Sequence, residues 1–217
     1  ILSAVRRQRY AVVGAGPAGL AAATTLAERG HEVHLFESAA QIGGQFNMAR
    51  KVPGKEEFSE TLRYFARRLD ATGVQLTLNT RVTADALIAQ KFDGVILATG
   101  VTARDPKIPG QDGPNVLNYI DVLARDKAVG ERVVIVGAGG IRFDVAEFLV
   151  TPPGHSPTLN LKEWLAEWGV ADPAEVRGGV VRAVEDGERD GSALELEPRR
   201  LLGREQVVDA PVEERLG

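Results

Sequence analysis

The hydrophobic pattern at the start of the chain predicts a strand, a turn and a helix in succession. Residues 9–13 form a short apolar run, residues 14–19 are rich in glycine, and the alanine-rich residues 20–29 have high helix propensity. Gly30 is the kind of residue that ends a helix in the left-handed conformation, and an apolar strand resumes over residues 31–36. The pattern therefore predicts a βαβ unit.

The pattern downstream predicts further elements of an α/β domain. Apolar side chains recur at helical spacing over residues 58–69, which indicates a helix with one buried face. Residues 74–78 and 80–82 alternate in the manner of half-exposed strands, and residues 92–98 predict a further strand. Residues 106–114 are rich in proline and glycine, so we expect a linker there.

A second glycine-rich turn repeats the arrangement of the first. Residues 133–136 predict a buried strand, residues 137–140 a glycine turn, and residues 141–150 a helix. We interpret residues 151–179 as an insertion with one amphipathic helix over residues 161–168. The predicted fold class is α/β, a Rossmann-like fold with two interleaved glycine-turn βαβ units.

Bulk properties narrow the class of protein. The net charge of -4 and the 44% hydrophobic content are those of an ordinary globular protein, and they favour neither nucleic acid nor membrane as a partner. No apolar run approaches the roughly 20 residues that cross a bilayer, and no secretory signal precedes the first strand, so we expect a cytoplasmic protein. The absence of cysteine removes disulfides and thiolate-ligated clusters. Because the chain starts at Ile1 and has its only methionine at Met48, we expect a piece of a longer protein or a processed chain.

The first glycine turn carries the clearest chemistry. In Gly14-x-Gly16-x-x-Gly19 the first glycine makes the tight turn, the second lets a pyrophosphate approach the backbone, and the third lets helix and strand pack closely. Glu37 follows at the end of the next strand, where a carboxylate accepts hydrogen bonds from an adenosine ribose. The pattern predicts dinucleotide binding. A plain strand-to-helix turn with a solvated glutamate is the alternative.

The second turn departs from this pattern at its third glycine. After Gly137 and Gly139 the expected glycine is replaced by Arg142, whose side chain we expect to push helix and strand apart or to point outward. If a nicotinamide cofactor binds there, Arg199 and Arg200 are the best-placed pair for a 2′-phosphate. The alternatives are an α/β layer that binds weakly or not at all, and a solvated arginine pair in a charged tail.

The sequence offers no catalytic or metal-ligating cluster. His31 and His34 fall on a predicted strand and His155 in a proline-rich loop, so structural or surface roles are favoured for all three. No nucleophile stands beside a base. Trp164 and Trp168 lie four residues apart on one helix, a spacing more typical of a core than of a cofactor stack.

Together these motifs resemble a known family. The chain is similar to the FAD/NAD(P)-binding half of the 2,4-dienoyl-CoA reductase family, whose members are related to trimethylamine dehydrogenase and old yellow enzyme. The resemblance rests on VVGAGPAGL at residues 12–20, IGGQF at 42–46, VPGKEEF at 52–58, LATG at 97–100 and GAGGI at 137–141.

The resemblance implies two cofactor sites. Residues 1–105 would be the first part of an FAD-binding domain, and residues 106–217 an incomplete NAD(P)-binding domain with the insertion and a charged tail. The implied FAD residues are Gly14, Gly16, Pro17, Ala18, Gly19, Glu37, Gly44, Gln45, Ala98, Thr99 and Gly100. The implied NADPH residues are Gly137, Gly139, Gly140, Arg199 and Arg200.

In such enzymes NADPH gives a hydride to FAD, and electrons then pass through an iron–sulfur cluster to FMN in a barrel domain. That domain, which the resemblance makes the expected partner, is absent from this chain, as are the cluster cysteines and the family's final FAD-contacting segment. The sequence therefore leaves two functions open. One is an oxidoreductase domain that passes hydride from NADPH to FAD. The other is a structural module that binds ADP or FAD without redox activity of its own.

Overall fold

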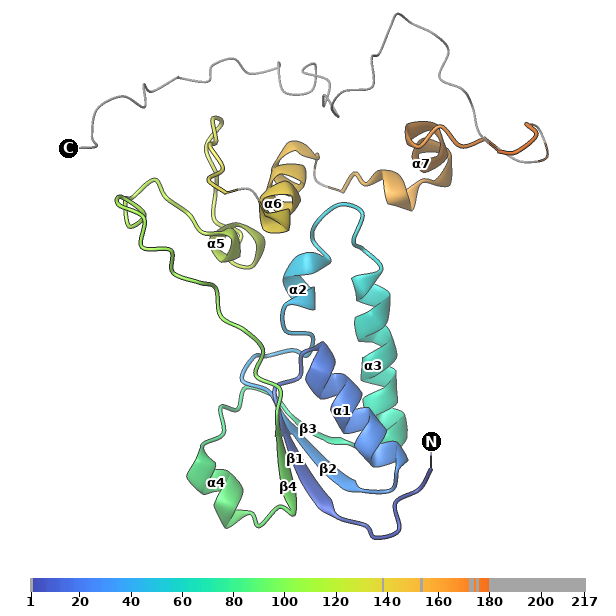
Figure 1. The fold of residues 1–217 in the computed structure, drawn as a ribbon, viewed down its shortest axis with the longest axis vertical. Helices are drawn as coiled ribbons and strands as arrows, with labels where there is room; N and C mark the ends of the chain where they lie inside the picture. Colours follow the sequence, from blue (N-terminus) through green and yellow to red (C-terminus); the bar gives the residue numbers. More distant parts are fainter. Residues whose placement is uncertain (1, 138, 153, 172–173, 175, 180–217) are drawn as a thin grey trace, which may run out of the picture. The chain divides into compact units, whose positions relative to one another are not determined.

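A computed structural model describes residues 2–137, 139–152, 154–171, 174 and 176–179 (Figure 1). The chain divides into two compact units, Ile1–Arg125 and Asp126–Gly217. The sequence also suggests strands at residues 180–184 and 193–197 of the charged tail, and these lie outside the described residues, as do Arg199 and Arg200.

The first unit is built around a parallel sheet of four strands. These are β1 (Arg9–Val13), β2 (Glu32–Phe36), β3 (Gln75–Thr77) and β4 (Gly94–Leu97). Their order is β3-β2-β1-β4, so that β1 lies in the middle between β2 and β4. The pairings of β1 with β2, of β1 with β4 and of β2 with β3 are all parallel, as βαβ connections require. The strands predicted around these positions are therefore confirmed.

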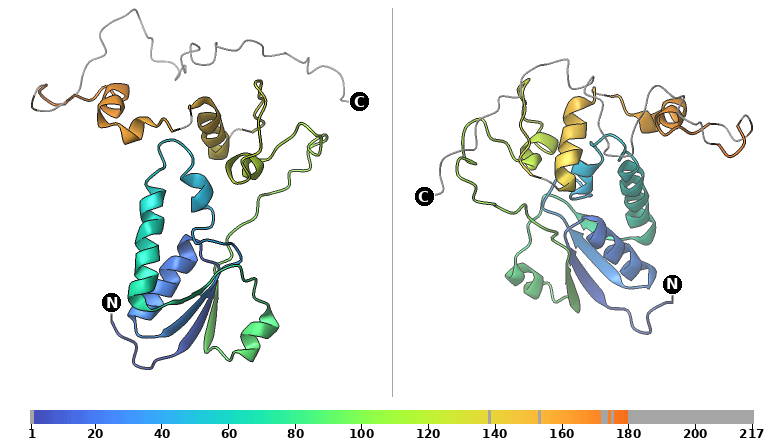
Figure 2. Two further views of the ribbon diagram at one scale, coloured as in Figure 1. Left: turned by 180° about the vertical axis from the view of Figure 1, so that it is seen from behind. Right: turned by 45° about the horizontal axis from the view of Figure 1, so that its top comes forward.

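Helices lie on both sides of this sheet (Figures 1 and 2). On one face α1 (Pro17–Glu28) packs against the strands and against α3 (Phe58–Thr72), which also contacts the short α2 (Phe46–Ala49). The other face carries α4 (Ala84–Ala89). A further short helix, α5 (Tyr119–Leu123), follows in the chain. This is the layered arrangement of a Rossmann-like fold, as predicted.

The core follows from the alternation of side chains along the strands. Val12 lies in register with Leu35 and Ile96, and all three belong to the cluster that α1 and α3 cover. Ala11 and Phe36 face the opposite way, into a smaller cluster with α4. Val12 and Leu35 are fully buried, and burial of such a side chain stabilises a fold by about 1.5–3 kcal/mol. These buried contacts fix β1 at the centre of the unit.

The end of α1 agrees with the prediction from the sequence, whereas two short helices with polar caps were not predicted. Gly30 has φ of +93°, the left-handed conformation predicted after α1. The sequence reading missed α4 and α5, which are too short to show periodicity. Both helices begin with a side-chain cap, and such capping residues can be recognised in a sequence. The Thr83 hydroxyl accepts a hydrogen bond from the Ala86 N–H, and Asn118 and Asp121 form a reciprocal capping box.

The prediction of a strand at residues 80–82 is wrong. Asn79 has φ of +53°, which breaks the extended conformation directly after β3. The Thr80 N–H then donates to the carbonyl of Glu37 at 2.8 Å, and Val82 packs into the cluster beside α4. The chain thus leaves the sheet at this point and turns toward α4.

The prediction of a buried strand at residues 133–136 is also wrong. Val134 is 88% exposed and Val136 80% exposed, and the segment is not paired in a sheet. A strand needs a neighbour for its backbone N–H and C=O groups. Among the described residues of 126–179 no β-ladder supplies one. Local apolarity alone therefore does not form this strand.

The second unit contains the predicted helices. They are α6 (Gly140–Val150) and α7 (Leu161–Glu167), and a 3-10 helix that was not predicted, η1 (Pro157–Leu159), lies between them in the chain. The rings of Trp164 and Trp168 lie 6.2 Å apart on α7, and Trp168 is 68% exposed rather than in a core. Across the part of the chain that the structure describes, every helix falls short of the length and apolarity that a membrane span needs.

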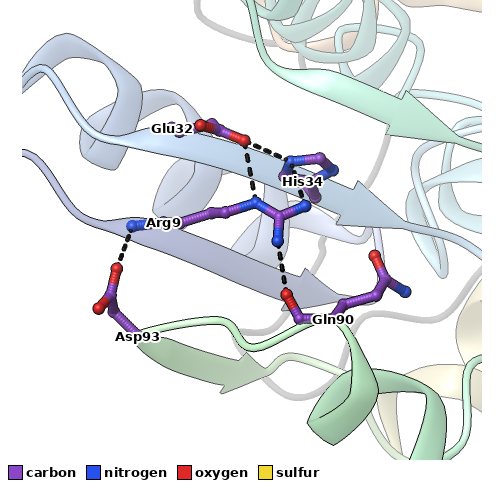
Figure 3. A network of polar contacts seen from close by, with 5 residues as sticks. All are labelled: Arg9, Glu32, His34, Gln90 and Asp93. Atoms are coloured by element: carbon purple, nitrogen blue, oxygen red, sulfur yellow. Dashed lines mark hydrogen bonds and ion pairs between the residues drawn. The ribbon is translucent and has the colours of Figure 1, made fainter.

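A polar network ties together the starts of β1 and β2 and the connection between α4 and β4 (Figure 3). The Arg9 guanidinium donates to the Glu32 carboxylate at 3.0 Å and to the Gln90 carbonyl at 2.5 Å. The Arg9 backbone N–H donates to Asp93 at 2.7 Å. His34 Nε2 lies 2.9 Å from the same Glu32 oxygen. His34 is therefore a structural residue of the sheet, as expected.

This network gives Glu32 a shifted titration. The hydrogen bond with His34, and next the one from Arg9, hold the pKa of the Glu32 carboxyl below its ordinary value. A depressed folded-state pKa contributes stability above the unfolded pKa, about 4.3, and that contribution is lost as the pH falls through the folded pKa. Glu32 therefore links folding to pH on the acid side.

We predict that Glu32→Gln lowers the thermal midpoint near neutral pH, and that its difference from the unmodified protein narrows below about pH 4. Thermal unfolding followed by circular dichroism at a series of pH values measures this. Glu57→Gln, at an exposed position at the start of α3, is the control. A deficit of constant size over the whole pH range would contradict the assignment.

Candidate functional site

The first glycine turn joins the end of β1 to the start of α1. Gly14 has φ of +103°, and its N–H donates to the Phe36 carbonyl at 2.8 Å. Gly16 is the N-cap residue of α1 in an extended conformation, and Pro17 occupies the first helical position, where a missing N–H costs nothing. The unpaired N–H groups at this helix end are suited to an anion.

Each of the three glycines is required for a different physical reason. A Cβ atom on Gly14 would collide with the Ala98 carbonyl, and one on Gly19 would collide with the carbonyl of Gly14. Gly16 differs, because the nearest atom to a Cβ there is the Gly44 Cα at 4.0 Å. Gly14 and Gly19 are thus constrained by the protein itself, whereas the space beside Gly16 is open to a ligand. The contacts of Gly14 and Gly19 agree with the tight turn and the close packing expected from the motif, and the role of Gly16 toward a pyrophosphate stays a prediction.

Glu37 is held beside the turn at the end of β2. Its side chain is buried, and one carboxylate oxygen accepts the Ala15 N–H at 2.7 Å. The other oxygen accepts the Ala39 N–H at 2.8 Å and the Ser38 hydroxyl at 3.2 Å. A carboxylate offers about four acceptor positions, so capacity remains for a ligand hydroxyl. The carboxylate is fixed in place by the same turn that offers the helix end.

A second loop, residues 42–45, lies against the first glycine turn. The Gly43 N–H donates to the Ala15 carbonyl at 2.8 Å, and a Cβ on Gly44 would lie 3.1 Å from the Gly16 Cα. Both loop glycines have positive φ, 117° at Gly43 and 51° at Gly44. The approach of two backbones therefore forms one wall of the open space beside Gly16. Sequence reasoning named Gly44 and passed over Gly43.

The end of β4 completes this arrangement. The Ala98 carbonyl lies against Gly14, and a Cβ on Gly14 would lie 3.3 Å from the Thr99 Cα. Gly100 follows with φ of +75°. The Gln45 side chain donates to the Val101 carbonyl at 3.3 Å, which joins the second loop to this segment. Four segments, at residues 14–19, 37–39, 43–45 and 98–101, thus meet at the carboxyl ends of the parallel strands, and they contain the residues expected to hold FAD.

At the second glycine turn the first and second glycines have backbone angles similar to those of Gly14 and Gly16. Gly137 has φ of +137°, and Gly139 is the extended N-cap of α6. The Arg142 guanidinium donates to the Gly137 carbonyl at 3.0 Å and lies 4.7 Å from the centre of the Phe143 ring. The arginine therefore folds back onto the turn. The implied NADPH residues Gly137, Gly139 and Gly140 stand at this helix end, and their role stays a prediction.

Apart from Glu37, the described part of the chain shows no cluster of acidic or histidine side chains that could bind a metal ion. His31 accepts a hydrogen bond from the Gln8 N–H at 3.2 Å, and its ring lies edge-on to Tyr10. The groups that border the first turn are therefore backbone N–H and C=O groups and the Glu37 carboxylate.

The fold and this site define a class, a Rossmann-like dinucleotide-binding oxidoreductase domain. The chain belongs to the pyridine nucleotide-disulphide oxidoreductase family, whose pattern matches residues 8–159. This confirms the predicted FAD/NAD(P)-binding fold class and the predicted type of enzyme domain.

Known proteins support the same assignment. The bilirubin reductase of Mediterraneibacter gnavus is 35% identical over 161 residues, which are 74% of this chain and 25% of that protein. A structure of 2-naphthoyl-CoA reductase with 2-naphthoyl-CoA is 37% identical, with a TM-score of 0.66, over 69% of this chain and 23% of that one. Both are reductases, in agreement with the family resemblance.

A more distant structure shares the fold alone. Mycobacterium tuberculosis FprA in complex with NADPH is 22% identical with a TM-score of 0.58, over 71% of this chain and 38% of that one. The chain spans about a quarter of the length of the bilirubin reductase and of the naphthoyl-CoA reductase.

We predict that Gly19→Ala destabilises the first unit and that Gly16→Ala does not. The methyl group on Gly19 meets backbone that cannot move aside, which outweighs the gain of about 1 kcal/mol in helix propensity and leaves a net loss of about 1–3 kcal/mol. Gly16 has φ of -74°, which alanine adopts, and we expect a change within about 1 kcal/mol.

Urea unfolding of both variants measures this difference. Gly130→Ala is the control, because a Cβ there meets nothing within 4 Å among the described residues. Equal stability of the Gly16 and Gly19 variants would contradict the separate roles.

Proposed function

We propose that the first unit binds FAD and that the chain passes a hydride from NADPH to this flavin as part of a 2,4-dienoyl-CoA reductase-like enzyme. The observation that carries the proposal is the open space beside Gly16, between the start of α1 and the loop at Gly44. The reductases among its relatives support the chemistry.

The residues present fit a dinucleotide in three respects. The start of α1 offers N–H donors at Gly16, where the missing side chain leaves room for phosphate. The Glu37 carboxylate is buried and fixed, with about one acceptor position left for a ribose hydroxyl. Main chain from Gly44 and Thr99 borders the turn, so a long ligand has backbone to lie along.

The residues of the chain bind and orient, and a bound flavin would supply the capacity to accept a hydride. In this proposal the turn holds the pyrophosphate and Glu37 holds the adenosine ribose. Gln45 and the segment after Ala98 lie along the remainder of the cofactor. The second turn would hold NADPH through the start of α6. The proposed FAD residues are Gly14, Gly16, Pro17, Ala18, Gly19, Glu37, Gly44, Gln45, Ala98, Thr99 and Gly100.

The electrons then need an acceptor outside the described residues. The chain makes up about a quarter of its reductase relatives, which leaves most of such a protein for other domains. We propose a barrel domain or subunit that carries FMN and an iron–sulfur cluster as the partner, and an enoyl-type thioester or a related conjugated compound as the substrate. We propose the cytoplasm as its location.

The ligand that the chain carries tests the proposal directly. Mass spectrometry of the small molecules released from the denatured protein should show FAD, and the protein should be yellow and bleach when NADPH is added without oxygen. Release of ADP without flavin would instead support the structural module. A colourless protein that takes up no added FAD would overturn the proposal.

We predict that Gly16→Ala abolishes FAD binding, or weakens it at least about tenfold, in a protein that remains folded. The methyl group occupies the space where phosphate must approach the backbone. Fluorescence titration with FAD measures the affinity, and circular dichroism reports the fold. Gly130→Ala is the control and should bind as the unmodified protein does. Normal FAD affinity in the Gly16 variant would place the pyrophosphate elsewhere.

We predict that Arg142→Gly tightens NADPH binding. The guanidinium now lies on the Gly137 carbonyl, so its removal clears the second turn and restores the third glycine of the motif. Titration with NADPH under anaerobic conditions measures the effect, and Arg142→Lys, which keeps a long basic side chain, is the control. Unchanged or weaker binding in the glycine variant would show that Arg142 does not obstruct the site.

A further inference from the structure

A buried polar atom beside the first site has no partner among the described residues. It is the side-chain oxygen Oδ1 of Asn47, on the short helix α2. Buried polar atoms are nearly always hydrogen-bonded, and an unpaired one destabilises the fold. An apolar side chain at this position would avoid that cost. An asparagine at this position is therefore explained by a role other than stabilising the fold.

The other end of the same amide makes a specific contact with the loop. Asn47 Nδ2 donates to the Ile42 carbonyl at 2.9 Å. The reverse orientation of the amide would place two oxygens against each other, so this contact decides which atom is which. A Cβ on Gly43 would lie 2.8 Å from Asn47 Nδ2 and 2.9 Å from the methyl groups of Leu62. The amide thus fits only because residue 43 has no side chain.

Two hydrogen bonds therefore hold the loop. The Gly43 N–H donates to the Ala15 carbonyl, and Asn47 Nδ2 donates to the Ile42 carbonyl. Gly44 follows directly, and a Cβ on it would lie 3.1 Å from the Gly16 Cα. A shift of the loop would therefore move the wall that a diphosphate has to pass.

We propose that Asn47 is a positioning residue of the nucleotide site, which holds residues 42–44 at the spacing from Gly16 that a diphosphate needs. The inference rests on the proposed function. It adds a side chain that does not touch the pyrophosphate but sets the distance between two backbones that do. The ligand class is any nucleotide diphosphate, with FAD and ADP as the two members that the site would accept.

The test compares Asn47→Leu with a matched variant that loses a similar bond elsewhere. Leucine keeps the branched shape and removes both the donor and the unpaired oxygen. Thr72→Val removes a half-buried hydrogen bond from a side chain to the Arg68 carbonyl, at the far end of α3. Each variant is titrated with FAD and, separately, with ADP, and its thermal unfolding is measured without ligand.

We expect Asn47→Leu to bind both nucleotides about tenfold more weakly at a temperature where it is fully folded. Thr72→Val should lower the thermal midpoint and leave both affinities unchanged. Asn47→Asp should also bind weakly, because its carboxylate cannot donate to the Ile42 carbonyl. Unchanged affinities in Asn47→Leu would overturn the inference, as would a loss of affinity in Thr72→Val equal to that in Asn47→Leu.

The two ligands separate this inference from the proposed function. An unmodified protein that binds ADP but not FAD would end the flavin proposal, while the ADP titrations still decide the role of Asn47. An unmodified protein that binds neither nucleotide would overturn both.

Discussion

Contact between backbones at the end of β1 is the constraint on which the rest of the first unit depends. Gly14, Gly19 and the carbonyl of Ala98 are so close that a single methyl group on either glycine would collide with main chain. The contact holds α1 against the sheet and places the end of β4 beside the first glycine turn. Since β1 lies between β2 and β4, the same contact also sets where Glu37 can reach.

The opposite end of the sheet is held by a different kind of force. There Arg9 joins Glu32 to the connection before β4. This network is half-exposed, so high salt and low pH weaken it. Exposed ion pairs contribute little compared with buried apolar contacts such as those of Val12 and Leu35. Packing therefore determines the fold, and the network mainly fixes the connection that leads into β4.

Local sequence predicted those elements whose stability is local or whose partners are close in the chain. The strand at Arg9–Val13 and the left-handed Gly30 follow from patterns a few residues long. The apolar run at 133–136 shows the limit, because a strand forms only where another strand pairs with it. Asn47 shows another limit. Its proposed role depends on the Ile42 carbonyl and on the room that Gly43 leaves, and no sequence motif indicates these contacts.

The two glycine turns separate what a motif specifies from what the fold adds. Both have a first glycine at positive φ and a second glycine as the extended N-cap of a helix. At the first turn the third glycine meets the backbone of Gly14, and Glu37 and Gly44 stand nearby. At the second turn Arg142 takes the third position, and its side chain satisfies the turn carbonyl itself. A helix end with the right backbone angles is thus common to both. The buried Glu37 carboxylate and the loop at Gly44 are present only beside the first turn among the described residues, and the proposed selectivity for a nucleotide rests on them.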